Sequence, residues 1–95
     1  MKLEGAVDMV CRDMELKDTV NMMLSEDHKE RFKAEYYQAV IRYKKLKKML
    51  SDWDNGELKF KPTCPKSIYD MQREAMIDYI AILEARAKKT EGIDL

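Results

Sequence analysis

Between Phe32 and Trp53, apolar and aromatic side chains recur at alternating intervals of four and three residues, with polar residues between them. This heptad spacing places them all on one side of an α-helix, which no other regular structure does. Four of the seven are aromatic, and the seam consists of Phe32, Tyr36, Ala39, Tyr43, Leu46, Leu50 and Trp53. The pattern predicts one long helix, over about residues 26–54, whose seam must be covered in water.

A capping residue precedes this helix, and residues that stop helices follow it. Ser25 precedes it, and a serine side chain can accept hydrogen bonds from the free amides of a first turn. Asn55 and Gly56 follow it, and both residue types tolerate the left-handed conformation that ends helices. We therefore expect the helix to begin after Ser25 and to end at the Asn-Gly pair.

Residues 55–65 read as an extended connection, with two prolines near its end. Leu58 and Phe60 alternate with charged residues in a stretch too short for a sheet, so we expect them to pin the connection across the helix ends. Pro65 disfavours a helix before it and permits one after it.

A third helix is expected over about residues 66–90, with Ser67 and Asp70 spaced as a capping box. Its apolar stripe is wider than a strict heptad seam, so this helix is expected to touch more than one neighbour. The stripe consists of Ile68, Met71, Ala75, Met76, Tyr79, Ile80, Ile82, Leu83 and Ala87. Beyond it, the tail is expected to leave the helix and to expose Ile93 and Leu95.

The N-terminal residues, from about Leu3 to Leu24, carry two partial apolar stripes that are out of register. A helix there either bends or presents different faces along its length. The segment is rich in methionine, a flexible residue that fills irregular gaps. It is expected either to lie over the hairpin or to serve as an arm that binds a partner.

These patterns predict an all-α fold, with an N-terminal helical arm at 1–24 and a long antiparallel helical hairpin at 25–95. The hairpin cannot bury all of its own apolar surface, because Tyr37, Val40 and Met49 flank the main seam. A chain this small commonly covers such surface by symmetric association. We therefore expect a homo-oligomeric helical bundle.

Charge is unevenly distributed along a chain whose formal net charge is zero. Residues 1–30 carry eight acids and four bases, whereas residues 42–66 carry eight bases and three acids. The asymmetry indicates attraction within or between subunits, a basic face kept for an anionic partner, or simply a solvated charged face. The neutral total disfavours binding to duplex nucleic acid.

Candidate catalytic and metal-ligating residues are few. His28 is the only histidine, so no Ser-His-Asp or Cys-His set can be assembled without it. Cys11, Cys64 and His28 are too few for a structural zinc site, which needs four ligands. The three glycines are isolated and form no phosphate loop. We expect a protein that is not an enzyme, with no metal and no cofactor.

Cellular setting follows from the cysteines and from the hydropathy. Two distant cysteines favour reduced thiols in a cytoplasmic protein. No apolar run approaches the length of a membrane span or of a signal peptide's apolar region.

One set of residues has the chemistry of an anion or nucleotide site. Lysines in the second half of the long helix and in the connection can meet phosphates, and nearby aromatic rings can stack on a base. The candidate residues are Arg42, Lys45, Lys48, Trp53, Lys59, Lys61, Thr63, Lys66, Tyr37 and Tyr43. The alternative is that the rings belong to the core and that the lysines form a solvated face.

About residues 25–95 resemble a known family. The stretches that carry the resemblance are Glu30–Gln38, Ile41–Leu46, Lys59–Pro65 and Met76–Arg86 with Gly92 and Ile93. They are similar to a small helical-hairpin family of tailed bacteriophages and prophages, described as related to a crAss-like phage protein. The resemblance implies a phage accessory protein, not an enzyme, that acts in the bacterial cytoplasm.

Small phage proteins of this size and build include antagonists of host immunity. Some are oligomers that sequester cyclic or ADP-ribose-type nucleotide signals. The function expected first is therefore sequestration of a small anionic nucleotide by a homo-oligomer. The alternatives are a protein-binding inhibitor or adaptor that uses the methionine-rich arm, or a purely structural, self-assembling protein.

Overall fold

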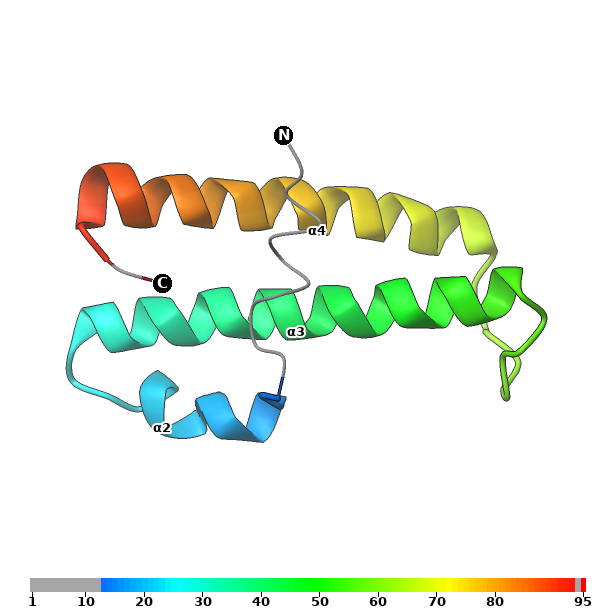
Figure 1. Ribbon diagram of the computed structural model, residues 1–95, viewed down its shortest axis with the longest axis horizontal. Helices are drawn as coiled ribbons and strands as arrows, with labels where there is room; N and C mark the ends of the chain where they lie inside the picture. Colours follow the sequence, from blue (N-terminus) through cyan, green and yellow to red (C-terminus); the bar gives the residue numbers. More distant parts are fainter. Residues whose placement is uncertain (1–12, 94) are drawn as a thin grey trace.

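The computed structural model describes residues 13–93 and residue 95. Two long helices, α3 (His28–Asp54) and α4 (Lys66–Arg86), run antiparallel beside each other (Figure 1). At its C-terminal end α4 continues into a π-helical turn, η2 (Ala87–Glu91). All regular elements in the described part of the chain are helical, so the predicted all-α fold is confirmed. None of these helices is long and apolar enough to cross a membrane.

The predicted seam of α3 forms most of its contact with α4. Tyr36 and Tyr43 are 2% and 0% exposed, and on α4 both Ile80 and Leu83 are fully buried. Toward the C-terminal end of α3 the seam is less enclosed, because Trp53 is only half-buried. The core cluster consists of Phe32, Tyr36, Ala39, Val40, Tyr43, Ile80, Leu83, Ala87 and Ile93.

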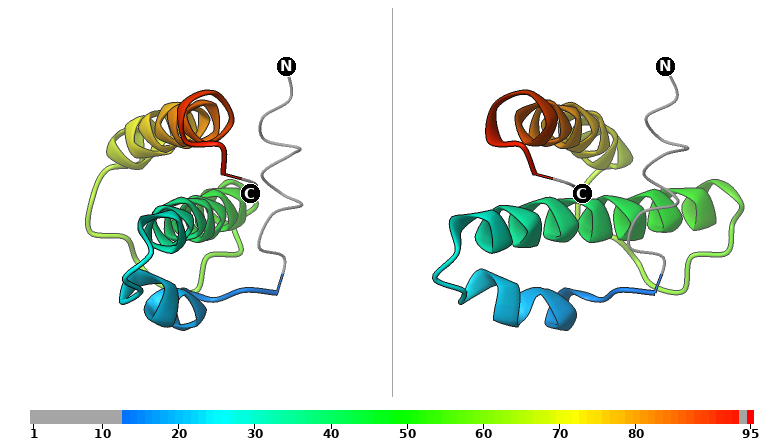
Figure 2. Two further views of the ribbon diagram at one scale, coloured as in Figure 1. Left: turned by 90° about the vertical axis from the view of Figure 1, so that its left-hand side faces the viewer. Right: turned by 60° about the vertical axis from the view of Figure 1, so that its left-hand side comes forward.

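Two short elements, η1 (Leu16–Thr19) and α2 (Val20–Met23), lie along α3 on the side opposite α4 (Figures 1 and 2). The fully buried Thr19 fixes them there. Its hydroxyl donates to the Leu16 carbonyl at 2.7 Å and accepts from the Gln38 amide at 2.9 Å. These elements cover only the N-terminal half of α3, so the lower side of its second half has no covering helix among the described elements (Figure 1).

The predicted N-terminal helix is present over residues 16–23, as η1 followed by α2, but it does not extend back over residues 13–15. Residues 1–12 lie outside the described part. Glu15 has an extended backbone, and its amide donates to the Asp18 carboxylate at 2.9 Å. This pairing is a capping box, which begins a new helix at Leu16. The second apolar stripe, which starts at Leu16, therefore coincides with the start of this helix.

The predicted helix starts also need correction. The N-cap of α3 is Asp27, whose carboxylate accepts from the Lys29 amide at 2.9 Å, while Ser25 accepts from the Asp27 amide at 3.0 Å. In α4 the N-cap is Pro65, which forms no side-chain cap. The predicted capping box is absent, because the helix begins at Lys66 and Ser67 therefore lies inside its first turn instead of at the N-cap.

The C-terminal tail folds back onto the core. Gly92 adopts a left-handed conformation with φ 60°, and the Ile93 amide donates to the Ala87 carbonyl at 2.9 Å. This turn buries Ile93, which is only 6% exposed. The prediction that Ile93 is exposed is therefore wrong, whereas Leu95 is exposed.

Candidate ligand-binding site

An open hollow of about 680 Å³ lies where α3 passes into the connection to α4. Aromatic, basic and small residues share its lining, which consists of Trp53, Gly56, Leu58, Lys59, Phe60, Lys61, Pro62 and Cys64. The volume falls within the range of about 300–1,000 Å³ that is usual for small-molecule sites. The hollow is shallow and largely open to solvent, so a molecule bound there would be covered on one side only.

The end of α3 shapes this hollow. The Glu57 amide donates to the Asp52 carbonyl at 2.7 Å, and Gly56 adopts φ 72°, so the chain reverses direction immediately after the helix. Trp53 sits in the last turn and contacts Tyr69 of α4 edge-on, with 6.1 Å between ring centroids. The indole is therefore held by α4 on one side and borders the hollow on the other.

The connection supplies the remaining aromatic surface. Phe60 is 56% exposed, so the prediction that it pins the helix ends is wrong. The exposed ring is accessible to a partner or a ligand, although a single exposed apolar side chain is common on protein surfaces. Lys59 and Lys61 flank it and are exposed as well. The hollow thus combines an accessible ring with two cations.

The two lysines of the hollow differ in their pairing from two other candidate cations, Lys48 and Lys66. Neither forms an ion pair with any residue that the structure describes. Lys48, by contrast, lies 2.9 Å from the Asp52 carboxylate, and Lys66 lies 3.2 Å from that of Asp54.

The same contacts alter the proton affinity of the paired lysines. The hydrogen bond that Lys48 donates to Asp52 raises the pKa of Lys48, and the one that Lys66 donates to Asp54 raises the pKa of Lys66. Local carboxylates therefore already balance these two charges.

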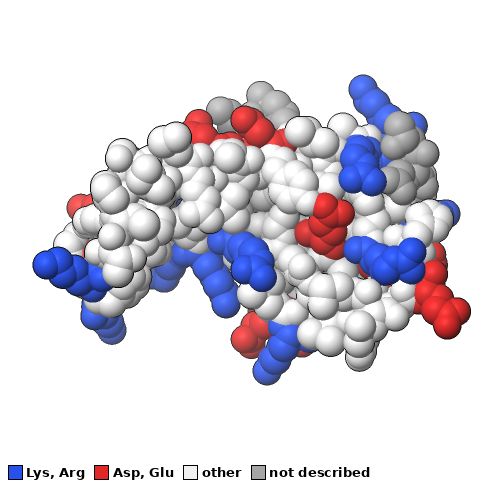
Figure 3. Space-filling model, turned by 180° about the vertical axis from the view of Figure 1, so that it is seen from behind, with Lys and Arg blue, Asp and Glu red and all other residues white. Residues whose placement is uncertain are grey.

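The structure brings only part of the candidate set together. Trp53, Lys59 and Lys61 line the hollow, whereas Thr63 is exposed in the connection outside the lining. Arg42 and Lys45 are exposed on α3, also outside the lining. Figure 3 shows Lys and Arg side chains around the indentation on the lower side of the molecule, between the connection and α2.

The two candidate tyrosines lie elsewhere. Tyr43 is fully buried between α3 and α4, and Tyr37 packs against Tyr36 with ring centroids 5.6 Å apart. Tyr43 therefore cannot stack on a ligand unless the helices separate. Its heptad position already indicated a core role.

Phe60 and Leu58 are lining residues outside the candidate set. Both occur in the Leu-Lys-Phe-Lys run that follows the Asn-Gly stop, in which apolar and basic residues alternate. In an irregular connection this alternation does not show which side chains are covered. The alternation therefore singles out Leu58 and Phe60, but it does not predict that they line the same hollow.

Comparison with known families bears on this site. A family model described as Sequestin matches residues 26–89, which span α3, the connection, all of α4 and the start of η2. The chain belongs to the Sequestin family. No curated protein and no solved structure gives a significant match.

The match places the whole hollow inside the Sequestin region, whereas η1 and α2 precede it. The family name denotes a sequestering protein, and this general role fits an open hollow lined by rings and cations. Within residues 13–93 no group of His, Cys, Asp and Glu could hold a metal ion. His28 is exposed at the first turn of α3, and Cys64 is an exposed free thiol at the hollow.

Proposed function

We propose that this Sequestin family member binds and sequesters a small anionic nucleotide in the hollow at the end of α3. The observation that carries the proposal is the exposed Phe60 between Lys59 and Lys61 in an open space of about 680 Å³. An aromatic face can stack on any base, and stacking contributes about 1–3 kcal/mol per base. Lysine supplies compact positive charge for phosphate.

Trp53 is the second stacking surface in this proposal. Tyr69 holds it edge-on, so its orientation is set before a ligand arrives. Such preorganisation lowers the entropic cost of binding. A cyclic oligonucleotide or an ADP-ribose-type molecule offers both a base and phosphates, which this lining can bind together. The sequestering character of the family supports capture without turnover.

Isothermal titration with cyclic dinucleotides, cyclic trinucleotides and cyclic ADP-ribose isomers tests the proposal. We expect saturable binding of at least one ligand, weakened tenfold or more by the double substitution K59Q/K61Q and by F60A. The matched control is K29Q, which removes an exposed lysine at the opposite end of α3. Absence of heat with every ligand, or equal affinity of K29Q and K59Q/K61Q, would overturn the proposal.

The proposed setting is a bacterial cell under phage attack, where removal of a nucleotide signal would protect the phage. Expression of the protein in bacteria that carry a nucleotide-signalling defence should restore phage plaques. The K59Q/K61Q variant should fail to restore them at equal protein levels. If that variant also restores plaques, the protection of the phage does not depend on the hollow.

A second candidate function is docking onto a protein partner. It is favoured by three apolar side chains at and just after α2, since Val20, Met23 and Leu24 are 42%, 46% and 74% exposed. Affinity capture from phage-infected cells with wild type and L24D tests it. A specific partner lost only with L24D supports docking, whereas a partner retained by both proteins, or no partner at all, argues against it.

A further inference from the structure

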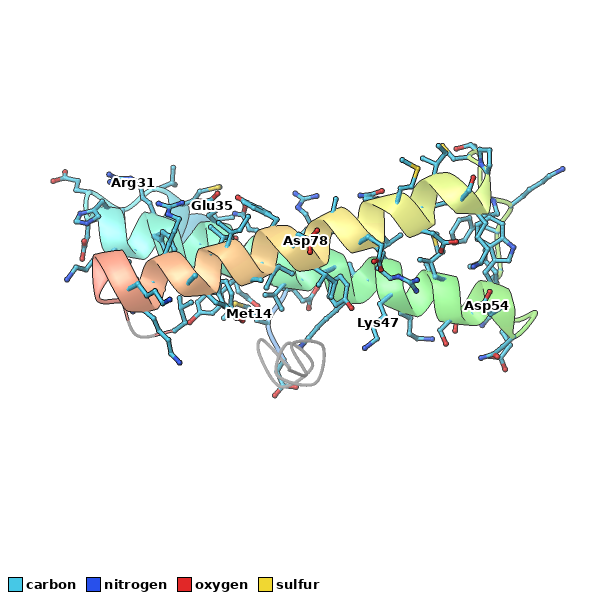
Figure 4. All side chains as sticks on the ribbon, turned by 90° about the horizontal axis from the view of Figure 1, so that it is seen from above. Met14, Arg31, Glu35, Lys47, Asp54 and Asp78 are labelled. Atoms are coloured by element: carbon cyan, nitrogen blue, oxygen red, sulfur yellow. The ribbon has the colours of Figure 1, made fainter. Side chains whose placement is uncertain are left out.

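An ion pair joins α3 to α4 across the ends of the connection. The Lys66 ammonium lies 3.2 Å from a carboxylate oxygen of Asp54 and 3.5 Å from one of Asp70. Asp54 is the last residue of α3, at the end of the hairpin where α4 begins with Lys66 (Figure 4). We call this arrangement the Lys66 bridge. It connects the two ends of residues 55–65 through a single lysine.

Asp54 stands where an acidic residue is unfavourable to its own helix. The carboxyl end of a helix carries a partial negative charge, which favours basic side chains in the last turn. The last turn of α3 contains no basic residue, and Asp54 ends it. Asp52, in the same turn, pairs with Lys48 inside α3 at 2.9 Å. The charge of Asp54 is instead compensated across the connection, by Lys66 of α4.

Asp70 holds the lysine in place at the start of α4. Its Oδ1 atom is buried and accepts no hydrogen bond from the described residues, so the ammonium 3.5 Å away supplies the charge that compensates it. The side chain of Lys66 is 35% exposed, whereas that of Lys48 is 75% exposed. Solvent ions therefore screen the Lys66 bridge less than the Lys48 pair.

A second contact links the same two turns. The indole of Trp53, next to Asp54 in the chain, meets the ring of Tyr69 edge-on, with 6.1 Å between centroids. Tyr69 in turn directly precedes Asp70. The ring pair and the Lys66 bridge therefore act on the same helix ends. Trp53 lines the hollow and Lys66 does not, so the bridge affects the hollow through the position of the indole.

The connection depends on how its ends are held. Except for Trp53, every residue that lines the hollow belongs to residues 55–65. Residues 58–64 form no hydrogen bond and no ion pair with any residue that the structure describes. Because this stretch has no polar contact of its own, its path follows from the placement of α3 and α4 on either side. A contact that fixes the two helix ends therefore fixes the shape of the hollow.

We propose that Lys66 is a positioning residue of the hollow. It joins the end of α3 to the start of α4, sets the place of Trp53 and the path of the connection, and does not contact the bound ligand. Its role thus differs from that of Lys59 and Lys61, which line the hollow. The proposal rests on the proposed function only where it concerns ligand affinity, because the bridge orders the hollow in the free protein as well.

Fluorescence of Trp53, the only tryptophan, tests the bridge in the free protein. D54A removes the contact across the connection and leaves Lys66 beside Asp70. We expect D54A to raise acrylamide quenching of Trp53 about twofold, because local opening exposes the indole. The matched control is D52A, which removes a carboxylate of the same turn whose partner lies within α3. D52A should leave the quenching unchanged.

Salt and helicity complete this experiment. Sodium chloride at about 0.5 M should raise the quenching in wild type but not in D54A, since salt screens the ion pair. Neither substitution weakens α3, because each removes an acid from its carboxyl end, and equal circular dichroism shows that both variants fold. Equal quenching of wild type and D54A, or equal increases in D54A and D52A, would overturn the proposal.

Ligand titration separates positioning from charge, with the cyclic dinucleotides, cyclic trinucleotides and cyclic ADP-ribose isomers as probes. D54A removes a negative charge near the hollow, so electrostatics alone predicts tighter binding of an anion. Positioning predicts the opposite, and we expect binding to weaken about three- to tenfold as preorganisation is lost. D52A measures the effect of charge without the bridge.

Tighter binding by D54A than by D52A would show that Lys66, once released from Asp54, contacts the ligand, and it would contradict the positioning role. Absence of binding to wild type would count against the proposed function alone. In that case the quenching of Trp53 still decides whether the Lys66 bridge orders the hollow.

Discussion

The hydroxyl of Tyr36 on α3 donates a hydrogen bond of 2.6 Å to Oε2 of Glu84 on α4. The Tyr36 ring is 2% exposed and Glu84 is half-buried, so this bond forms at the edge of the packed core. Nearby, the Arg86 guanidinium stacks over the Phe32 ring at 4.8 Å from its centroid. The start of α3 and the end of α4 are thus joined by polar as well as apolar contacts.

Replacement of Tyr36 by Phe should lower the free energy of unfolding by about 1–2 kcal/mol, because a charge-assisted hydrogen bond is lost while the ring still fills its place. Urea denaturation followed by circular dichroism measures the change. E84Q, which keeps an acceptor, should cost less than E84A. Equal stability of Y36F and wild type would show that the bond contributes nothing net.

Leu50 and Leu24 provide a matched pair for the contribution of packing. Leu50 is 1% exposed and Leu24 is 74% exposed. L50A should destabilise the protein by about 2–5 kcal/mol, since it removes buried methyl groups and leaves a cavity. L24A should change stability by less than about 0.5 kcal/mol. Similar losses in both variants would contradict the placement of Leu50 in the core.

The hydrogen bond to Glu35, with smaller contributions from burial and from the carboxylate charge, raises the pKa of Tyr79 from 10.0 to about 12. Because the folded-state pKa exceeds the unfolded one, the stabilisation is complete below pH 10 and declines as pH rises toward 12. Y79F should therefore lose less stability than wild type between pH 9 and 11. Denaturant unfolding at both pH values measures this difference, and identical pH profiles would contradict it.

Thr19 connects the N-terminal elements to α3. T19V keeps the shape but leaves the Leu16 carbonyl and the Gln38 amide without this partner. We expect a loss of about 1–3 kcal/mol, concentrated in η1 and α2. Limited proteolysis should cut T19V near Leu24 faster than wild type while the α3–α4 hairpin remains intact. T19S, which keeps the hydroxyl, serves as the control.

Gly56 forms the turn that shapes the hollow, with φ 72° and open space where a Cβ would be. G56A should cost about 1 kcal/mol through backbone strain alone. G56N should cost less, since asparagine tolerates the left-handed region. Thermal unfolding compares the two variants, and a larger loss in G56N would show that something other than backbone conformation matters there.

The sequence predicts the two long helices well, because the heptad seam depends only on helix geometry. The end of the helix at Asp54 is predicted as well, and Gly56 adopts the left-handed backbone there, although Asn55 does not. Helix starts are less predictable, because several polar residues compete to cap them. Asp27 displaces Ser25 in this role, and Pro65 takes the N-cap position of α4, which leaves Ser67 inside the helix.

Prediction is weakest where side chains from irregular segments meet. Phe60, which the spacing predicts to be covered, is open. Ile93, which the spacing predicts to be exposed, is covered. Both outcomes depend on the path of a turn, which residue spacing does not encode. The candidate cations were likewise identified by type, but their carboxylate partners depend on the relative placement of α3 and α4.

The core cluster lies mainly along the first half of α3 and the last half of α4, while the hollow lies at the other end of the hairpin. Substitutions around Phe60 therefore have little effect on the contacts that hold the helices together. Selection can alter the lining residues one at a time while the fold remains intact. Such separation allows a hairpin of this kind to diversify in what it captures over evolutionary time.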